Sequence, residues 1–156
     1  MLLDETNENR YNDESKTKNP ERINFDLISG PAAGYRLVLT QQNIDFHKEK
    51  YGGERPELHD DEFIDKKIIE AVCDPDALYQ RIEKAVPGEK IILEKNVYVF
   101  YKANPDREYT YNSKLIKSYV CVRVRKKRWQ KILEVITSFY SPRITEEKKC
   151  QPLTRI

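Results

Sequence analysis

The sequence of 156 residues is short of cysteine and of long apolar runs. Its three cysteines, Cys73, Cys121 and Cys150, are far apart and lack Cys-x-x-Cys spacing, which argues against a disulfide framework and against a zinc knuckle. No stretch reaches the roughly 18 to 20 consecutive apolar residues that a membrane span needs, and the polar residues after Leu3 exclude the apolar core of a signal peptide. We therefore expect a cytoplasmic protein with reduced thiols and no membrane partner.

The chain also lacks the short motifs that identify several enzyme classes. Its five glycines form no phosphate-cradling loop, and neither a Gly-x-Ser-x-Gly elbow nor a His-Glu-x-x-His pair is present. Nucleotide hydrolase, serine hydrolase and zinc protease functions therefore have no support in the sequence.

One acidic run could be taken for a metal site. His59 is followed by Asp60, Asp61 and Glu62, and an imidazole with carboxylates suits several divalent ions. Adjacent residues on one segment rarely converge on one ion, however, and carboxylates at the start of a helix interact favourably with the positive end of its dipole. We expect these residues to begin a helix, and we expect neither a metal nor another cofactor.

The chain divides into three parts by composition. Residues 1–22 are rich in Asn, Glu, Asp, Lys, Ser and Thr, and such a segment buries too little apolar surface to offset the loss of chain entropy on folding. We expect a disordered N-terminal arm there, a single α+β domain over residues 23–142, and a tail over residues 143–156.

Apolar spacing predicts the elements of this domain. A short strand is expected over residues 35–39, then a helix over 41–51 with Thr40 as its N-cap, and a second helix over 63–72. Later segments have the period-two pattern of strands, namely 90–93, 97–101, 118–125 and 132–140. We therefore expect an α+β fold in which N-terminal helices pack on a small antiparallel β-sheet meander.

Positive charge is concentrated in the second half of the chain. Residues 1–70 hold 10 basic and 16 acidic side chains, whereas residues 71–156 hold 18 basic and 10 acidic ones. Eight basic side chains and no acidic one lie over residues 114–131. Two interpretations remain open: a solvated hairpin whose turn is formed by residues 125–128, or a phosphate-binding rim. A rim for single-stranded RNA or DNA is favoured by nearby aromatic residues, which are Tyr119, Trp129 and Tyr140.

The order of several short segments along the chain is also informative. In sequence they are a strand ending Leu39-Thr40, a helix with His47, the loop Arg55-Pro56-Glu57-Leu58, the turn Asp74-Pro75-Asp76, and a closing strand with Thr137-Ser138-Phe139-Tyr140. This order, from Tyr35 to Pro142, resembles the phage-associated branch of the barnase, EndoU, colicin and RelE-like (BECR) RNase superfamily. The resemblance implies a barnase-like or RelE-like fold and a toxin-like endonuclease that acts on RNA.

One departure from the family pattern bears on the predicted activity. The family has Arg-His-Pro-Glu-Leu in the loop, whereas this chain has Glu54-Arg55-Pro56-Glu57-Leu58 and so lacks the second histidine. A site with one histidine is compatible with two functions. Either the chain cleaves RNA, or it is a catalytically inactive nucleic-acid-binding or protein-interaction module of the same fold.

The resemblance implies roles for five residues of a catalytic site. His47 would transfer protons, because an imidazole titrates near neutral pH, although a helix histidine can also be purely structural. Arg55 would hold the phosphate through its planar guanidinium, or would pair with a neighbouring glutamate at the surface. Thr137 matches the family's closing-strand hydroxyl and is the first candidate to orient the phosphate. Alternation along the strand leaves Ser138, together with Tyr140, as the second candidate.

Cationic and aromatic residues of the second half would bind the nucleic-acid backbone. They are Lys102, Arg123, Arg125, Lys127, Arg128 and Trp129. The first hypothesis is therefore a metal-independent endoribonuclease that uses the ribose 2′-OH as nucleophile and leaves a 2′,3′-cyclic phosphate. Its substrate would be a tRNA or another structured RNA, and an antitoxin or immunity protein is considered as a partner. A further hypothesis is a structural or regulatory protein whose basic hairpin meets an acidic surface.

Overall fold

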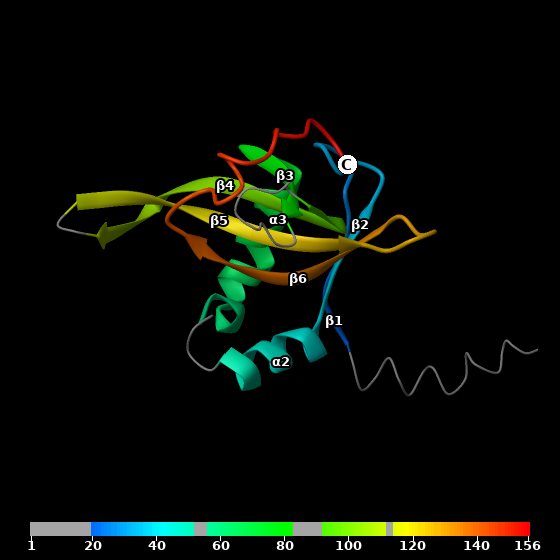
Figure 1. The fold of residues 1–156 in the computed structure, drawn as a ribbon. Helices are drawn as coiled ribbons and strands as arrows, with labels where there is room; N and C mark the ends of the chain where they lie inside the picture. Colours follow the sequence, from blue (N-terminus) through cyan, green and yellow to red (C-terminus); the bar gives the residue numbers. More distant parts are fainter. Residues whose placement is uncertain (1–19, 52–55, 83–91, 112–113) are drawn as a thin grey trace, which may run out of the picture.

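The computed structural model describes residues 20–51, 56–82, 92–111 and 114–156, and a six-stranded mixed sheet forms its centre. The strands are β1 (Glu21–Asp26), β2 (Arg36–Thr40), β3 (Ala77–Ile82), β4 (Leu93–Tyr111), β5 (Lys114–Lys126) and β6 (Ile132–Ser141). Their order across the sheet is β1-β2-β6-β5-β4-β3, which can be followed in Figure 1. β2 runs parallel to β6, whereas every other neighbouring pair is antiparallel.

Short helices connect some of these strands. They are α2 (Gln41–Tyr51), the 3₁₀ helix η2 (Pro56–His59), the π-helix η3 (Phe63–Lys67) and α3 (Ile68–Cys73), which continues directly from η3. α2 has the predicted bounds, and the Oγ1 atom of Thr40 accepts a hydrogen bond of 3.2 Å from the backbone N–H of Asn43, as expected of an N-cap. No helix within the described residues is long and apolar enough to cross a lipid bilayer.

The predicted fold class is wrong, because a mixed six-stranded sheet with short helices replaces the expected helices on a small antiparallel meander. β1 and β2 form a hairpin ahead of the helices, and β2 adds a parallel strand beside β6. β3 is a further strand for which no prediction was made. β1 was not predicted, because it lies at the end of the polar N-terminal segment and only two of its six residues, Ile23 and Phe25, are apolar, which is too short a period-two pattern to indicate a strand.

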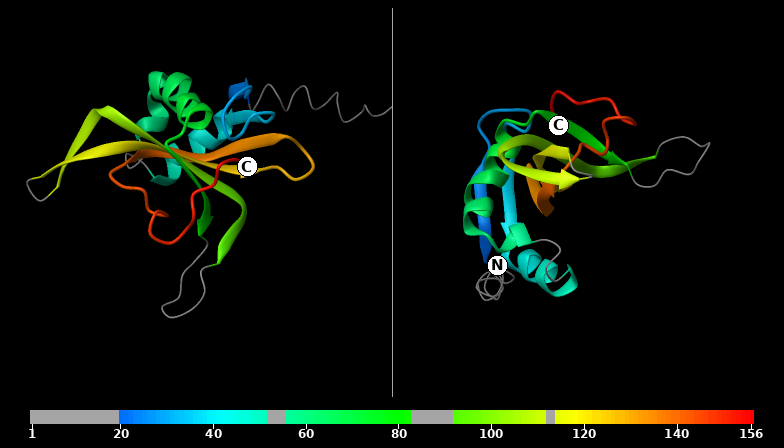
Figure 2. Two further views of the ribbon diagram at one scale, coloured as in Figure 1. Left: turned by 90° about the horizontal axis from the view of Figure 1, so that it is seen from above. Right: turned by 90° about the vertical axis from the view of Figure 1, so that its left-hand side faces the viewer.

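Two layers cover opposite faces of the sheet, as Figure 2 shows. α3 lies on one face, where Ile68 and Val72 are buried in the main hydrophobic core. The C-terminal residues 143–156, predicted as a tail, lie along the other face. There Ile144 packs against a smaller buried cluster that includes Tyr101.

Hydrogen bonds attach this C-terminal segment to the sheet. The hydroxyl of Tyr101 in β4 donates to Oε1 of Glu146 at 2.5 Å, and both side chains are almost completely buried. The backbone N–H of Leu153 donates to the carbonyl oxygen of Leu78 in β3 at 2.7 Å. The last residues of the chain are therefore part of the folded unit.

β6 contains a bulge at Ile136. In its pairing with β5, Val135 lies opposite Val124 and Thr137 lies opposite Arg123, so Ile136 is the extra residue. Val135 and Val124 both belong to the main core. Because a bulge shifts the alternation by one position, Thr137 lies on the opposite face from Val135 and on the same face as Arg123. The uninterrupted alternation assumed for this strand is therefore wrong.

Candidate functional site

A cleft of about 510 Å³ lies between α2 and the edge of β6. β2 pairs with β6 only as far as Val38, which lies opposite Glu134. Beyond this pair, α2 instead of β2 lies beside β6. There the side-chain amide of Asn43 donates to the carbonyl oxygens of Val135 at 2.5 Å and of Ile136 at 3.2 Å. The cleft therefore forms where a helix replaces a strand beside the bulge.

The cleft brings together residues that are far apart in the sequence. It is lined by Thr40, Gln42, Asn43, Phe46, His47, Arg123, Arg125, Glu134, Val135, Ile136 and Thr137. Four of the residues predicted for the site are among them: His47, Arg123, Arg125 and Thr137. The cleft is thus a candidate site for an anionic ligand, with an imidazole, two guanidinium groups and a hydroxyl.

His47 is held by its own helix. Its side chain is 5% exposed, and its Nδ1 atom lies 2.9 Å from the carbonyl oxygen of Asn43. Because a carbonyl oxygen only accepts hydrogen bonds, Nδ1 bears the hydrogen and donates it. Nε2 is therefore the nitrogen without a hydrogen in the neutral imidazole. The ring of Phe46 packs edge-on against the imidazole, with 5.7 Å between the ring centres.

Arg123 is a partly buried cation with an unsatisfied donor. Burial, followed by the repulsion of Arg81, lowers the pKa of the Arg123 guanidinium. Its Cζ atom lies 5.3 Å from the centre of the Phe139 ring, and its buried Nε has no hydrogen-bond partner among the described residues. A buried donor without a partner costs about 1 to 3 kcal/mol, and an anionic oxygen bound in the cleft would supply that partner.

Arg125 and Glu134 bring opposite charges to the open side of the cleft. The two residues lie directly opposite each other in the register of β5 and β6, and Arg125 is exposed. The carboxylate of Glu134 also pairs with Lys127, whose Nζ lies 3.2 Å from Oε1. Lys127, predicted to contact nucleic acid, therefore does not line the cleft. It forms an ion pair with Glu134, which does.

The structure places two predicted residues of the closing strand away from the cleft. Ser138 is fully buried, and its hydroxyl donates to the carbonyl oxygen of Cys121 at 2.8 Å. The ring of Tyr140 packs against Phe63 with 5.0 Å between centres, and its backbone N–H donates to Oε2 of the buried Glu57 at 3.3 Å.

Other predicted residues also lie apart from the cleft. Lys102 pairs with Asp74, with Nζ 3.2 Å from Oδ2. Arg128 and Trp129 lie in the turn between β5 and β6 and do not line the cleft. Arg55, the predicted phosphate clamp, lies outside the described residues.

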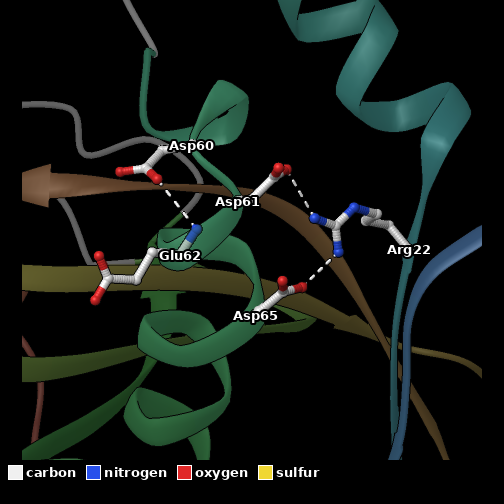
Figure 3. Close-up of polar contacts among 5 residues, drawn as sticks. All are labelled: Arg22, Asp60, Asp61, Glu62 and Asp65. Atoms are coloured by element: carbon white, nitrogen blue, oxygen red, sulfur yellow. Dashed lines mark hydrogen bonds and ion pairs between the residues drawn. The ribbon is translucent and has the colours of Figure 1, made fainter.

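Two aspartates near the start of this helical segment bind Arg22, as Figure 3 shows. The guanidinium of Arg22 in β1 contacts Asp61 at 2.9 Å and Asp65 at 2.5 Å. These hydrogen bonds, that to Asp65 first, raise the pKa of Arg22. Asp60 accepts from the backbone N–H of Glu62 at 3.1 Å. Across the part of the chain that the structure describes, no group of three or more His, Cys, Asp or Glu could hold a metal ion.

Sequence reasoning missed three residues that shape the cleft. Asn43 looks like an ordinary polar helix residue, although its position three residues after the N-cap Thr40 is one where side chains often make capping contacts. Phe46, next to His47 in the sequence, also lines the cleft. Glu134 lies opposite Arg125, and the bulge at Ile136 puts it on the same face as Thr137.

The comparisons with known proteins add no relative on which to base a function. The sequence matches no protein-family model, and no curated protein or solved structure is significantly similar to it.

Proposed function

We propose that this protein is a metal-independent endoribonuclease whose active site is the cleft between α2 and β6. The observation that supports this function is that His47, Arg123, Arg125 and Thr137, from three different elements, line one cleft. The order of sequence segments that resembles the phage-associated RNases supports the same proposal. We place the protein in the cytoplasm, where its three cysteines would remain reduced.

Two residues that line the cleft, Glu134 and His47, carry the proton transfers of the proposed reaction. The carboxylate of Glu134 takes the proton of a ribose 2′-OH, and the 2′ oxygen attacks the adjacent phosphorus. The bond from phosphorus to the 5′ oxygen breaks, and that oxygen receives a proton from Nε2 of protonated His47. The products are a 2′,3′-cyclic phosphate and a 5′-hydroxyl.

The remaining polar groups of the cleft stabilise charge. The guanidinium of Arg123 donates to the non-bridging oxygens, on which negative charge increases in the transition state. The hydroxyl of Thr137, opposite Arg123 in the sheet, orients the same phosphate. Arg125 attracts the next phosphate of the RNA strand, because the Arg125 side chain is exposed and lines the cleft.

The test is incubation of the purified protein with total RNA and with tRNA in EDTA, followed by analysis of the ends of any fragments. We expect fragments with 2′,3′-cyclic phosphate and 5′-hydroxyl ends, and we expect them to disappear with His47→Ala. Lys48→Ala is the matched control, because Lys48 is exposed on α2 and does not line the cleft. Cleavage that persists in His47→Ala would contradict the proposed site.

The second candidate is a binding module that does not cleave RNA. It is favoured by one observation, that His47 is the only histidine among the described residues that line the cleft. Under this hypothesis the protein binds RNA, Arg123→Met weakens binding, and neither the parent protein nor any variant produces fragments. Binding and cleavage measured on the same samples separate the two candidates.

A further inference from the structure

Cations and aromatic rings also surround the turn between β5 and β6, outside the cleft. The backbone N–H of Lys127 donates to the carbonyl oxygen of Ile132 at 2.9 Å and closes the turn. Trp129 occupies this turn with φ of 67°, and its side chain is 91% exposed. A positive φ is rare for a bulky residue and costs about 1 to 3 kcal/mol, and such strain is concentrated at functional sites.

The exposed indole is already next to a cation. The Cζ atom of Arg128 lies 5.3 Å from the centre of the Trp129 ring. An indole is the most favourable aromatic surface for cations, and its flat face also stacks with nucleic-acid bases. With Arg128 on one side and 91% of the side chain exposed, Trp129 presents aromatic surface to a ligand.

A cationic hollow adjoins this indole. Trp129, Lys126, Lys131 and Tyr35 line a depression of about 290 Å³. The Nζ atoms of Lys131 and Lys126 lie 5.0 Å and 5.7 Å from the centre of the Tyr35 ring. Two ammonium groups beside one ring concentrate positive charge in this hollow.

A second hollow extends this surface. It measures about 400 Å³, shares Tyr35 and Lys131 with the first and adds Arg155 from the C-terminal segment. Among the residues that the structure describes, no acidic side chain lines either hollow. Three cationic side chains, Lys126, Lys131 and Arg155, therefore lie around Tyr35.

We propose that this surface, formed by Tyr35, Lys126, Trp129, Lys131 and Arg155, binds single-stranded RNA. One base stacks on Trp129, and the phosphates next to it contact the three cations around Tyr35. The accessible indole favours RNA over an acidic protein segment, because carboxylates would use the cations and leave the aromatic face empty. The inference deepens the proposed function, since the RNA that it binds is the substrate of the cleft.

The two sites lie on opposite faces of β5. Arg125 lines the cleft and Lys126 lines the first hollow, and successive residues of a strand point to opposite faces. Lys126, the last residue of β5, follows Arg123 by three residues, which at a rise of about 3.3 Å each corresponds to about 10 Å along the strand, and Trp129 lies beyond it in the turn. A ligand that fills both sites is therefore an extended single strand of about four or more nucleotides that passes around the hairpin.

Tryptophan fluorescence tests the proposal directly, because Trp129 is the only tryptophan in the chain. The probe is a 2′-O-methyl oligouridylate of about ten nucleotides, which cannot be cleaved because it has no free 2′-OH. We expect saturable quenching of the emission. We also expect Trp129→Ala, assayed by polarisation of a labelled oligouridylate, to weaken binding roughly tenfold.

Charge variants keep the indole in place and provide the second measurement. Lys131→Glu and Arg155→Glu should each weaken the quenching titration by about three- to tenfold, whereas Lys148→Glu should leave it unchanged. Lys148 is an exposed residue of the same C-terminal segment as Arg155 and lines neither hollow. Because Trp129, Lys131 and Arg155 are at the surface, loss of folding does not complicate these variants.

The outcomes separate this inference from the proposed enzyme. Oligouridylate binding that leaves the emission of Trp129 unchanged would overturn the inference, whatever the RNase assay shows. Quenching by polyglutamate that is stronger than quenching by the oligonucleotide would also overturn it, because the surface would then suit an acidic protein. Quenching by the oligonucleotide in a protein that yields no RNA fragments would confirm this surface and contradict only the enzyme.

Discussion

The side-chain amide of Asn43 in α2 donates a hydrogen bond of 2.5 Å to the backbone carbonyl oxygen of Val135 in β6. It does so just beyond the point where β2 stops pairing with β6, so an amide replaces the donors that a continuing strand would supply. The carbonyl oxygen of Asn43 in turn accepts from Nδ1 of His47. One residue therefore joins α2 to the bulge and positions the imidazole of the cleft.

Asn43→Ala should destabilise the protein by about 1 to 2 kcal/mol. The variant leaves the carbonyl oxygens of Val135 and Ile136 without the amide, and an unsatisfied buried acceptor costs about 1 to 3 kcal/mol. The measurement is the free energy of unfolding in urea, with Lys48→Ala as the control on the exposed side of the same helix. Equal stability of the two variants would show that the amide does not hold α2 against β6.

Local signals account for the elements that were predicted correctly. α2 follows an N-capping threonine and precedes Gly52-Gly53, and both signals are contained in a few consecutive residues. The middle of β5 alternates buried Val122 and Val124 with Arg123 and Arg125, which is the pattern of a strand. Such features depend on neighbours in sequence and can be recognised without the fold.

The features that were not predicted depend on distant residues. The parallel pairing of β2 with β6 joins Arg36 to Ile132, and nothing near either residue specifies the other. The bulge at Ile136 has no local signal either, because isoleucine is a favourable strand residue. The resemblance put His47 and Thr137 in one catalytic site and Arg123 among the nucleic-acid contacts, but the cleft that all three line depends on this long-range pairing and on the bulge.

Two adjacent hydroxyls of β6 offer a matched pair of substitutions. Thr137→Val removes a hydroxyl that lines the cleft and should lower the rate of RNA cleavage by about 10- to 100-fold, with little change in substrate binding. Ser138→Ala removes a buried hydroxyl that donates to the carbonyl oxygen of Cys121, so it should cost about 1 kcal/mol of stability. The measurements are kcat on an RNA oligonucleotide and the free energy of unfolding in urea.

The opposite result for Thr137 and Ser138 would contradict the proposed position of the reacting phosphate. If Ser138→Ala abolished cleavage at full stability while Thr137→Val cleaved normally, the reacting phosphate would lie on the other face of β6.

Arg123→Met should weaken RNA binding about 10- to 100-fold without destabilising the fold. Burial already lowers the pKa of this guanidinium, and replacing a buried cation by an apolar side chain of similar size is often neutral for stability. The loss of one phosphate contact should also reduce the slope of log K against log salt by about 0.7 for a single strand. Binding titrations at several salt concentrations measure both quantities.

Lys148→Met is the control for the salt dependence, because Lys148 is exposed and does not line the cleft. A slope that is the same for Arg123→Met and for the parent protein would mean that Arg123 contacts no phosphate.

The buried pair Tyr101 and Glu146 predicts a loss of stability at alkaline pH. Burial, followed by the nearby Cys121, raises the pKa of the Tyr101 hydroxyl. Above about pH 10 the unfolded chain loses this proton while the folded chain retains it, so the unfolded state binds fewer protons. Stability is therefore fully present below about pH 10 and falls as the pH rises towards the raised pKa of the folded state.

Tyr101→Phe should reduce this dependence on pH. The variant loses the hydrogen bond to Glu146 and should be less stable at neutral pH, but its free energy of unfolding should fall less steeply above about pH 10, by up to about 1.4 kcal/mol per pH unit. Urea unfolding at several pH values from about 9 to 11 measures the two slopes. Tyr79 and Cys150, whose pKa values burial also raises, are present in both proteins and cancel in the comparison. Parallel curves for the two proteins would show that the Tyr101 hydroxyl is not the group that links the C-terminal segment to alkaline unfolding.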